Sequence, residues 1–196
     1  MNLGYTRPMR AVMLDVPKEL LAERHRNGWD KRDEVWEGVL HMVPPPATRH
    51  NFFGGDLILF LRRVADRRGL LMVYETGVFD SVQGLRDFRI PDLVVGPKDV
   101  FSERGVEGKA TLIVEILSPN DESRDKLPFY ARVGVREAWL VHPVSRAFEL
   151  FELRDGELVP CDPQRGVTRS PALGIEIEVI TGPTLRLRDG NDIAEI

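Results

Sequence analysis

The 196-residue chain contains only one cysteine, Cys161, so an intramolecular disulfide and a cysteine-rich zinc site are both excluded. The sequence also lacks an apolar run long enough to cross a bilayer, and its first residues contain no apolar signal core. We therefore expect a cytoplasmic protein without a membrane partner. The four histidines show no paired spacing, which argues against a zinc site built on them.

A positive net charge is missing as well. The formal net charge is -4 at pH 7, so overall charge does not by itself indicate a nucleic-acid partner. Arginine pairs at 62–63 and 67–68 could form a basic face, although the pattern favours a solvated helix surface. No linker or low-complexity tract divides the chain, and 42% of its residues are hydrophobic. We expect one domain over residues 1–196.

The spacing of apolar residues predicts the main elements. A helix over 50–68 is expected from apolar residues three and four positions apart, ending at Gly69. Shorter helices are predicted after a cap at Asp15 and after a cap at Asp125. Strands or hairpins are expected at 34–43, 70–75, 88–95, 110–117, 137–141, 148–153 and 174–180, with a turn at Asp155-Gly156. Together they predict an α/β (α+β) fold, a mixed central sheet flanked by helices, with additional β-hairpins.

Two of these strands each carry one carboxylate among apolar residues. Asp92 precedes the run at 93–95, and Glu115 lies inside the run at 112–117. A buried carboxylate is costly unless it is paired, hydrogen-bonded or bound to a metal. A Mg2+ ion, or Mn2+ in its place, needs only one or two protein carboxylates and keeps several waters. Asp92 and Glu115 would suffice, and the backbone carbonyl of Ile116 could add a third oxygen.

A lysine follows closely in the sequence. Pro128 is tolerated in the first turn of a helix, so a cap at Asp125 would place Lys126 at the first helical position. The side chain would then lie near the end of the Glu115 strand. A metal-bound water can attack a phosphodiester, and a nearby ammonium offsets the charge that grows on the phosphoryl oxygens. Asp92, Glu115 and Lys126 therefore predict metal-assisted attack on phosphate.

Each of these residues also has a structural interpretation. Asp92 after a proline is typical of a turn cap, and Glu115 could form an ion pair with an arginine or with Lys126. Lys126 could equally be a solvated helix residue, since lysine is normally exposed. His50, near a helix start, is more often a capping or packing residue than a ligand. Taken together, the motifs favour a site.

Several motifs in order resemble the Uma2 family of bacterial proteins, in the PD-(D/E)XK restriction-endonuclease-like superfamily. They are Trp36 to Pro46 followed by His50, Pro91-Asp92, Glu115 to Pro119, Lys126 to Tyr130, and Gly134 to Val141. The resemblance spans residues 34–153. It implies a restriction-endonuclease-like fold, a DNA substrate and a homodimer whose two sites address two strands.

The resemblance also implies roles for single residues. Asp92 and Glu115 would ligate the metal, and Lys126 would replace the superfamily's motif lysine, whose usual position two residues after the glutamate is Leu117 here. Glu37 stands where the family tends to carry an acidic residue, and such an acid can assist the metal site. These assignments make Asp92, Glu115, Lys126 and Glu37 the expected catalytic residues.

Three functions are open on this basis. The first is a Mg2+- or Mn2+-dependent nuclease that cleaves DNA. The second is a noncatalytic nucleic-acid-binding or assembly module that keeps the nuclease fold, which the mildly acidic charge favours. The third is a metal-dependent hydrolase of a small phosphorylated molecule, which lacks a glycine-rich phosphate loop of the usual kind. The presence of two acids and a lysine favours the nuclease.

Overall fold

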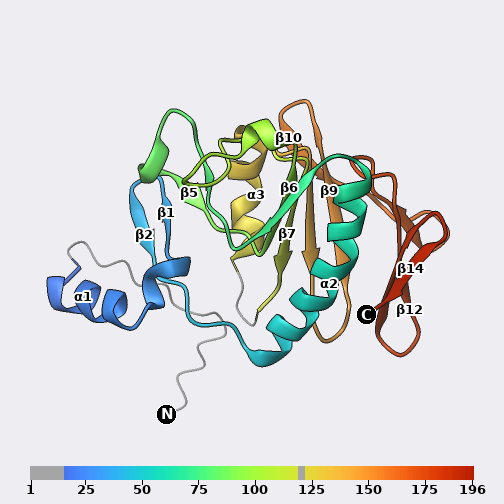
Figure 1. Ribbon diagram of the computed structural model, residues 1–196, viewed down its shortest axis with the longest axis horizontal. Helices are drawn as coiled ribbons and strands as arrows, with labels where there is room; N and C mark the ends of the chain where they lie inside the picture. Colours follow the sequence, from blue (N-terminus) through green and yellow to red (C-terminus); the bar gives the residue numbers. More distant parts are fainter. Residues whose placement is uncertain (1–15, 119–121) are drawn as a thin grey trace, which may run out of the picture.

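The computed structural model describes residues 16–118 and 122–196, and a mixed six-stranded sheet lies at its centre (Figure 1). Its strand order is β10-β9-β8-β7-β6-β3. β7 and β8 are parallel, and every other neighbouring pair in this sheet is antiparallel. The strands are β3 (Leu71–Tyr74), β6 (Leu93–Gly96), β7 (Leu112–Ile116), β8 (Glu137–Val141), β9 (Phe148–Arg154) and β10 (Glu157–Pro160).

Two helices cover opposite faces of this sheet (Figure 1). Helix α2 (Thr48–Arg67) buries the predicted apolar stripe against one face, in one cluster with Leu112, Val114 and Ile116 of β7. Helix α3 (Ser123–Arg132) packs on the other face, in one cluster with Ile113. The side chains of β7 therefore alternate as predicted, and Glu115 belongs to the α3 face.

The N-terminal part forms a second, four-stranded sheet beside α3. Helix α1 (Lys18–Arg26) and the 3-10 helix η1 (Trp29–Arg32) lead into the predicted hairpin, which is present as β1 (Glu34–Trp36) and β2 (Val39–His41). The sheet order is β2-β1-β5-β4, completed by β4 (Val78–Phe79) and β5 (Phe88–Arg89). Short 3-10 helices η2 (Gly84–Arg86) and η3 (Lys98–Val100) lie in the connections.

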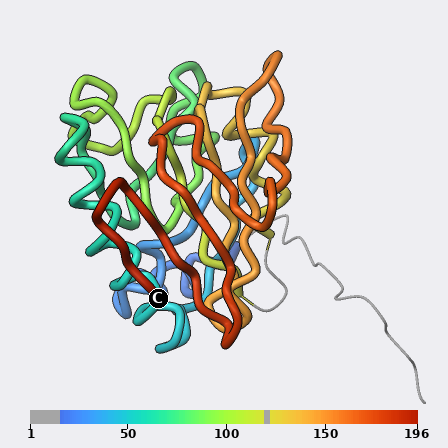
Figure 2. Tube along the Cα trace, turned by 90° about the vertical axis from the view of Figure 1, so that its right-hand side faces the viewer, coloured from blue at the N-terminus to red at the C-terminus, as the bar shows by residue number. Residues whose placement is uncertain are grey.

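The C-terminal part forms a third sheet on the α2 side, with its strands crossing in front of the central sheet in Figure 2. Its order is β11-β12-β13-β14, and only β12 was expected. Inward-facing Ile177, Leu185 and Leu187 join the same buried cluster as α2. The strands are β11 (Val167–Arg169), β12 (Glu176–Ile180), β13 (Thr184–Asp189) and β14 (Asp192–Glu195).

Two of the expected elements differ from the structure. The predicted strand over 88–95 is broken between β5 and β6, because Pro91 has no N–H to continue a ladder and the chain there passes from one sheet to the other. Helix α3 begins at Ser123 with Glu122, not Asp125, as its N-cap, so Lys126 is the fourth helical residue and Pro128 lies inside the helix. Burial of Phe129 and Tyr130 outweighs the local preference for proline in the first turn.

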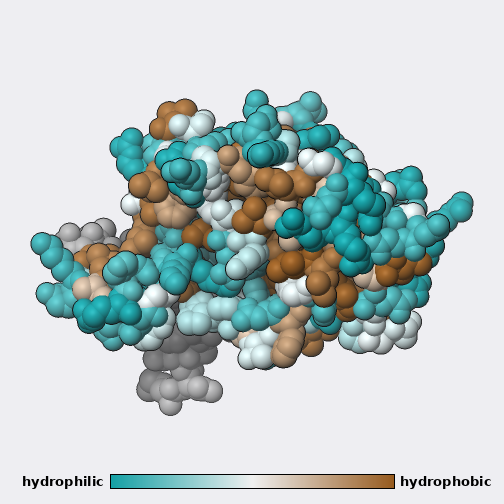
Figure 3. All heavy atoms as spheres, viewed as in Figure 1, coloured by the Kyte–Doolittle hydropathy of each residue, from teal (hydrophilic) through white to brown (hydrophobic). Residues whose placement is uncertain are grey.

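Two predicted features involve residues that the structure does not describe. The expected cap Asp15 and the motif residue Pro119 fall outside the described residues. Over residues 16–118 and 122–196, no helix has both the length and the apolarity needed to cross a membrane. On the face shown in Figure 3, hydrophilic residues are interspersed with apolar ones.

Candidate functional site

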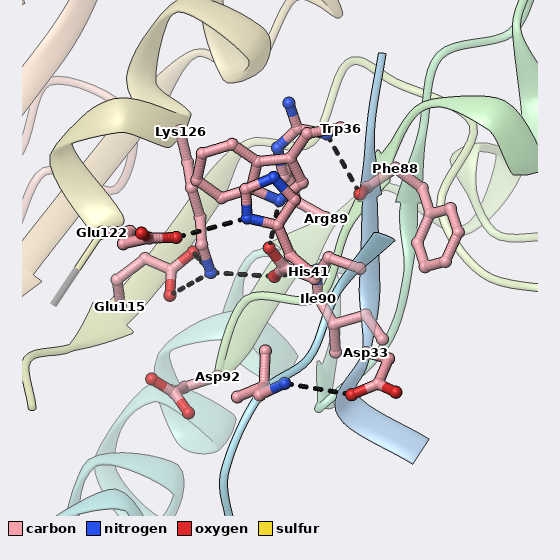
Figure 4. Close-up of polar contacts among 12 residues, drawn as sticks. Asp33, Trp36, His41, Phe88, Arg89, Ile90, Asp92, Glu115, Glu122 and Lys126 are labelled. Atoms are coloured by element: carbon pink, nitrogen blue, oxygen red, sulfur yellow. Dashed lines mark hydrogen bonds and ion pairs between the residues drawn. The ribbon is translucent and has the colours of Figure 1, made fainter. Parts of the chain in front are cut away.

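The antiparallel register of β6 and β7 brings Asp92 and Glu115 together. Leu93 pairs with Val114, so one further step of the same register places Asp92 opposite Glu115. The Ile116 N–H donates a hydrogen bond of 2.7 Å to Asp92 Oδ2. The Glu115 side chain is only 5% exposed and that of Asp92 16%, so both acids are largely withdrawn from water. Figure 4 shows the two carboxylates near one another, below the start of α3.

Lys126 joins this pair from the first turns of α3. Its Nζ lies 3.1 Å from Glu115 Oε1, so the predicted approach of the lysine to the Glu115 strand is present in the structure (Figure 4). The same Nζ lies 2.8 Å from Oε1 of a second acid, Glu34. The Lys126 side chain is 12% exposed, which is unlike a solvated helix lysine. The ammonium is thus shared between two buried carboxylates.

Glu34 is a member of the site that the sequence analysis missed. Its side chain is 2% exposed, and both oxygens have partners. Oε1 accepts a bond of 2.8 Å from the Ile90 N–H in addition to that from Lys126, and Oε2 accepts one of 2.7 Å from Trp36 Nε1. A signal was present in the sequence, because residues 34 and 36 of a strand share a face, and a tryptophan there indicates an inward face.

Glu37, the acid predicted from this hairpin, lies in the turn between β1 and β2. Its side chain is 78% exposed, and its nearest basic group is Arg132 Nη1 at 3.9 Å, at the far end of α3. None of the contacts among the described residues connects Glu37 to Asp92, Glu115 or Lys126. A metal-assisting role for Glu37 stays a prediction, whereas Glu34 is the acid of this hairpin that contacts Lys126.

His50 holds the other oxygen of Asp92. It lies in the first turn of α2, largely buried, with Nε2 3.3 Å from Asp92 Oδ1. Burial alone would lower the pKa of His50, but the hydrogen bond and negative charge of Asp92 raise it overall. With Ile116 N–H on Oδ2 and His50 on Oδ1, the Asp92 carboxylate is oriented from two sides.

The charge balance of the site is unusual for a protein interior. Burial, together with the charges of Asp92 and Glu34, raises the pKa of Glu115 to about 8, although Lys126 and a 2.5 Å hydrogen bond from the Tyr130 hydroxyl act in the opposite direction. Burial would lower the pKa of Lys126, but its two acidic partners raise it. Glu115 and Glu34 therefore share the Lys126 ammonium, and Asp92 adds a third carboxylate that does not contact it.

A second layer of side chains supports Glu34. The Arg89 guanidinium lies between two aromatic rings, 4.4 Å from the centre of Trp36 and 4.2 Å from that of Phe129. Arg89 also donates bonds of 2.8 Å to Asp87 and 3.0 Å to the Val35 carbonyl. Figure 4 shows Arg89 beside Trp36. Because Trp36 in turn donates to Glu34, this cluster fixes the acid that binds Lys126.

Comparison with known proteins identifies the family. A family model described as "Uma2: Putative restriction endonuclease" matches residues 19–182. The chain belongs to the Uma2 family. The match confirms the predicted resemblance and extends it beyond residues 34–153 on both sides. A comparison with curated proteins found no match.

A solved structure shows the same fold. The crystal structure of "a putative nuclease belonging to DUF820" from Anabaena variabilis superposes with a TM-score of 0.58 and 17% sequence identity, covering 72% of this chain and 83% of that one. At this low sequence identity, the structural similarity supports a shared fold and carries no conclusion about function. It confirms the predicted mixed α/β architecture for this Uma2 protein.

The donor set in this Uma2 protein fits a divalent cation held largely by water. The carboxylates of Asp92, Glu115 and Glu34, when ionised, outnumber the one ammonium of Lys126, and such an excess of acidic groups favours a divalent ion. The described residues contain no cluster of three or more acidic, histidine or cysteine ligands, so a closed protein cage is not present in that part of the chain. Mg2+ commonly binds through one or two carboxylates and keeps its waters, which suits Asp92 and Glu115.

Proposed function

We propose that this Uma2 protein is a divalent-metal-dependent nuclease that hydrolyses DNA phosphodiester bonds. One observation carries the proposal. Two largely buried carboxylates, Asp92 and Glu115, lie opposite each other on neighbouring strands. The Lys126 ammonium lies 3.1 Å from the Glu115 carboxylate. Two acids on neighbouring strands and an amine bound to one of them match the chemistry of metal-assisted phosphoryl transfer. Membership of a family described as "Putative restriction endonuclease" supports the same reaction.

Each residue has a distinct role in this proposal. Asp92 and Glu115 would hold Mg2+ or Mn2+, with the carbonyl of Ile116 as a further candidate oxygen. The ion, when bound, would lower the pKa of a water molecule and screen the phosphate. Lys126 would place its positive charge beside the phosphoryl oxygens as their negative charge grows. His50 would keep Asp92 oriented, and so act as a positioning residue.

A cleavage assay tests the proposal. The purified protein is incubated with single- and double-stranded DNA in Mg2+ or Mn2+, beside Glu115→Gln, which keeps the side-chain shape but removes its negative charge. Glu157→Gln serves as the matched control, because Glu157 is an exposed residue of the β9–β10 hairpin. We expect cutting by the parent and the control, and none by Glu115→Gln or in the presence of a chelator. Equal cutting by Glu115→Gln would refute the assignment.

A noncatalytic binding or assembly module is the second candidate. The observation in its favour is that Lys126 is already bound by both Glu34 and Glu115, as in a structural ion-pair network. Such a module would bind DNA, or bind metal, without cleaving under any of the assay conditions. That result would replace the nuclease proposal.

Assembly and location form part of the same proposal. A homodimer would bring two sites to two strands, and light scattering of the purified protein measures its mass directly. A single mass of about one chain at the assay concentration would contradict the dimer. The thiol of Cys161 is free, which agrees with the proposed reducing, cytoplasmic location.

A further inference from the structure

A second basic side chain, Arg32, lies beside the candidate metal ligands. It is the last residue of η1, and one residue, Asp33, separates it from the strand that begins with Glu34. Its guanidinium forms an ion pair with Glu75, and the Glu75 N–H in turn donates a hydrogen bond of 3.0 Å to the Asp92 carbonyl. Arg32 is therefore bound to the residue that pairs with Asp92.

The surroundings hold Arg32 in place. The neighbouring Asp33 is bound by Arg24 Nε at 3.0 Å and by the Val43 N–H at 3.0 Å, which ties the end of η1 to the chain that follows β2. Glu75 has a φ of 47°, a left-handed conformation that a residue with a side chain adopts only when its surroundings impose it. The position of Arg32 is thus determined by contacts on both sides.

The charge of Arg32 acts on the site, and within residues 16–118 and 122–196 its hydrogen-bond donors are only partly used. Burial lowers the pKa of Arg32 and the negative charge of Asp92 opposes that shift, while Arg32 lowers the pKa of His50. A guanidinium carries five N–H donors, and among the described residues only Glu75 accepts a hydrogen bond from this one. The side chain is 21% exposed, so the remaining donors can reach a ligand.

We propose that Arg32 binds a backbone phosphate of the DNA substrate, next to the phosphate that Asp92, Glu115 and Lys126 would act on. Arginine offers two parallel donors to phosphate oxygens, a geometry that lysine cannot supply. Arg32 and Lys126 then hold the backbone from two elements, η1 and α3. This inference rests on the proposed nuclease function and adds a substrate-binding residue to it.

Binding of a short fluorescent DNA duplex, followed by anisotropy, tests the role of Arg32. Ca2+ replaces Mg2+ to supply the same charge at the site during the measurement. Arg32→Gln is expected to raise the dissociation constant about tenfold, as loss of a charge-assisted hydrogen bond predicts. The slope of log affinity against log salt should also fall by about 0.9, the value for one lost phosphate contact. In the cleavage assay the loss should appear mainly in KM.

Two further variants separate phosphate binding from a structural role. Glu75→Gln removes the same ion pair but keeps the guanidinium, so it should bind DNA as tightly as the parent or more tightly. Arg63→Gln, which removes an ion-paired arginine on the α2 surface facing Asp192, should leave the affinity unchanged. Equal losses of affinity and melting temperature in Arg32→Gln and Glu75→Gln would overturn the inference in favour of a structural ion pair.

The outcome also distinguishes this inference from the function on which it rests. A parent that cleaves DNA beside an Arg32→Gln variant that binds as tightly as the parent refutes the role of Arg32 alone. A parent that neither binds nor cleaves DNA in any of the metals refutes the nuclease function, and the phosphate role of Arg32 with it.

Discussion

Replacing Glu34 by glutamine is the perturbation that most directly tests the architecture of the site. Glu34 accepts three hydrogen bonds, from Ile90 N–H and Lys126 Nζ at one oxygen and from Trp36 Nε1 at the other. Glutamine has the same shape, but one end of its amide carries donors only. Whichever way the amide is turned, an N–H group of the glutamine faces a donor of the protein. At least one buried hydrogen bond is therefore lost.

The magnitude follows from the burial of this group. A buried donor left without an acceptor costs about 1–3 kcal/mol. Lys126 also loses one of its two counter-charges, and removing a partner from a buried ion pair costs about 3–5 kcal/mol when no other partner is left. Because Glu115 stays within 3.1 Å of Lys126, the full penalty does not apply. We expect Glu34→Gln to lower the free energy of unfolding by about 2–3 kcal/mol, from the lost hydrogen bond and a part of the ion-pair penalty.

Urea unfolding followed by circular dichroism measures this change. The midpoint should fall while the slope against urea stays constant, and the melting temperature should drop by about 4–12 °C for a chain of this size. Glu37→Gln is the matched control, because Glu37 lies in the same hairpin with its side chain 78% exposed. Its cost should stay within about 0.5 kcal/mol.

The result that would refute this reasoning is an equal, small cost for both variants. It would mean that the three contacts of Glu34 do not hold Lys126 in solution. The same pair of variants also tests the sequence-based role of Glu37. If Glu37 assists the metal, Glu37→Gln weakens Mn2+ binding, whereas the structure predicts that Glu34→Gln disturbs the site.

Further predictions concern the metal, the lysine and the outer ion pairs. Asp92→Asn should abolish Mn2+ binding in calorimetry with an unchanged circular dichroism spectrum, and binding equal to the parent would refute the ligand role. Lys126→Ala should keep Mn2+ binding but lower turnover, and unchanged turnover would remove the lysine from the mechanism. Hydrogen bonds from Arg68 and Arg67 outweigh burial and lower the pKa of Asp189 from 3.8 to about 2. This depressed pKa contributes stability that is present above pH 4 and lost as the pH falls toward 2. Asp189→Asn should therefore cost about 1 kcal/mol at pH 7, after allowance for solvent screening, and less at pH 3 by urea unfolding; a cost that does not change with pH would contradict it.

Local sequence patterns were sufficient for the elements whose side chains repeat regularly. The apolar stripe predicted α2, and alternation placed Glu115 on the face of β7 opposite to Leu112 and Val114. The Asp155-Gly156 turn was also predictable, since both residues adopt left-handed φ values of 49° and 86° and join Arg154 directly to Glu157. Periodicity and turn chemistry act over a few residues, so a single chain reveals them.

Tertiary packing decided the features that local preferences do not contain. The helix α3 starts three residues earlier than predicted because burial of Phe129 and Tyr130 outweighed the position of Pro128. The registers of separate strands and the placement of α3 together brought Asp92, Glu115 and Lys126 into one group, which the motifs only suggested.

The sequence by itself determined the fold class and the family and proposed three residues for the candidate site, because apolar spacing and ordered motifs are readable along one chain. Only the tertiary structure could decide which acid of the N-terminal hairpin meets Lys126. Glu34 and Lys126 are 92 residues apart, and their contact depends on how the hairpin packs beside α3. The placement of Arg32 beside Asp92 has the same origin, since it depends on Glu75, 43 residues away. Contacts of this kind arise from packing between elements and leave no periodic signal in the sequence.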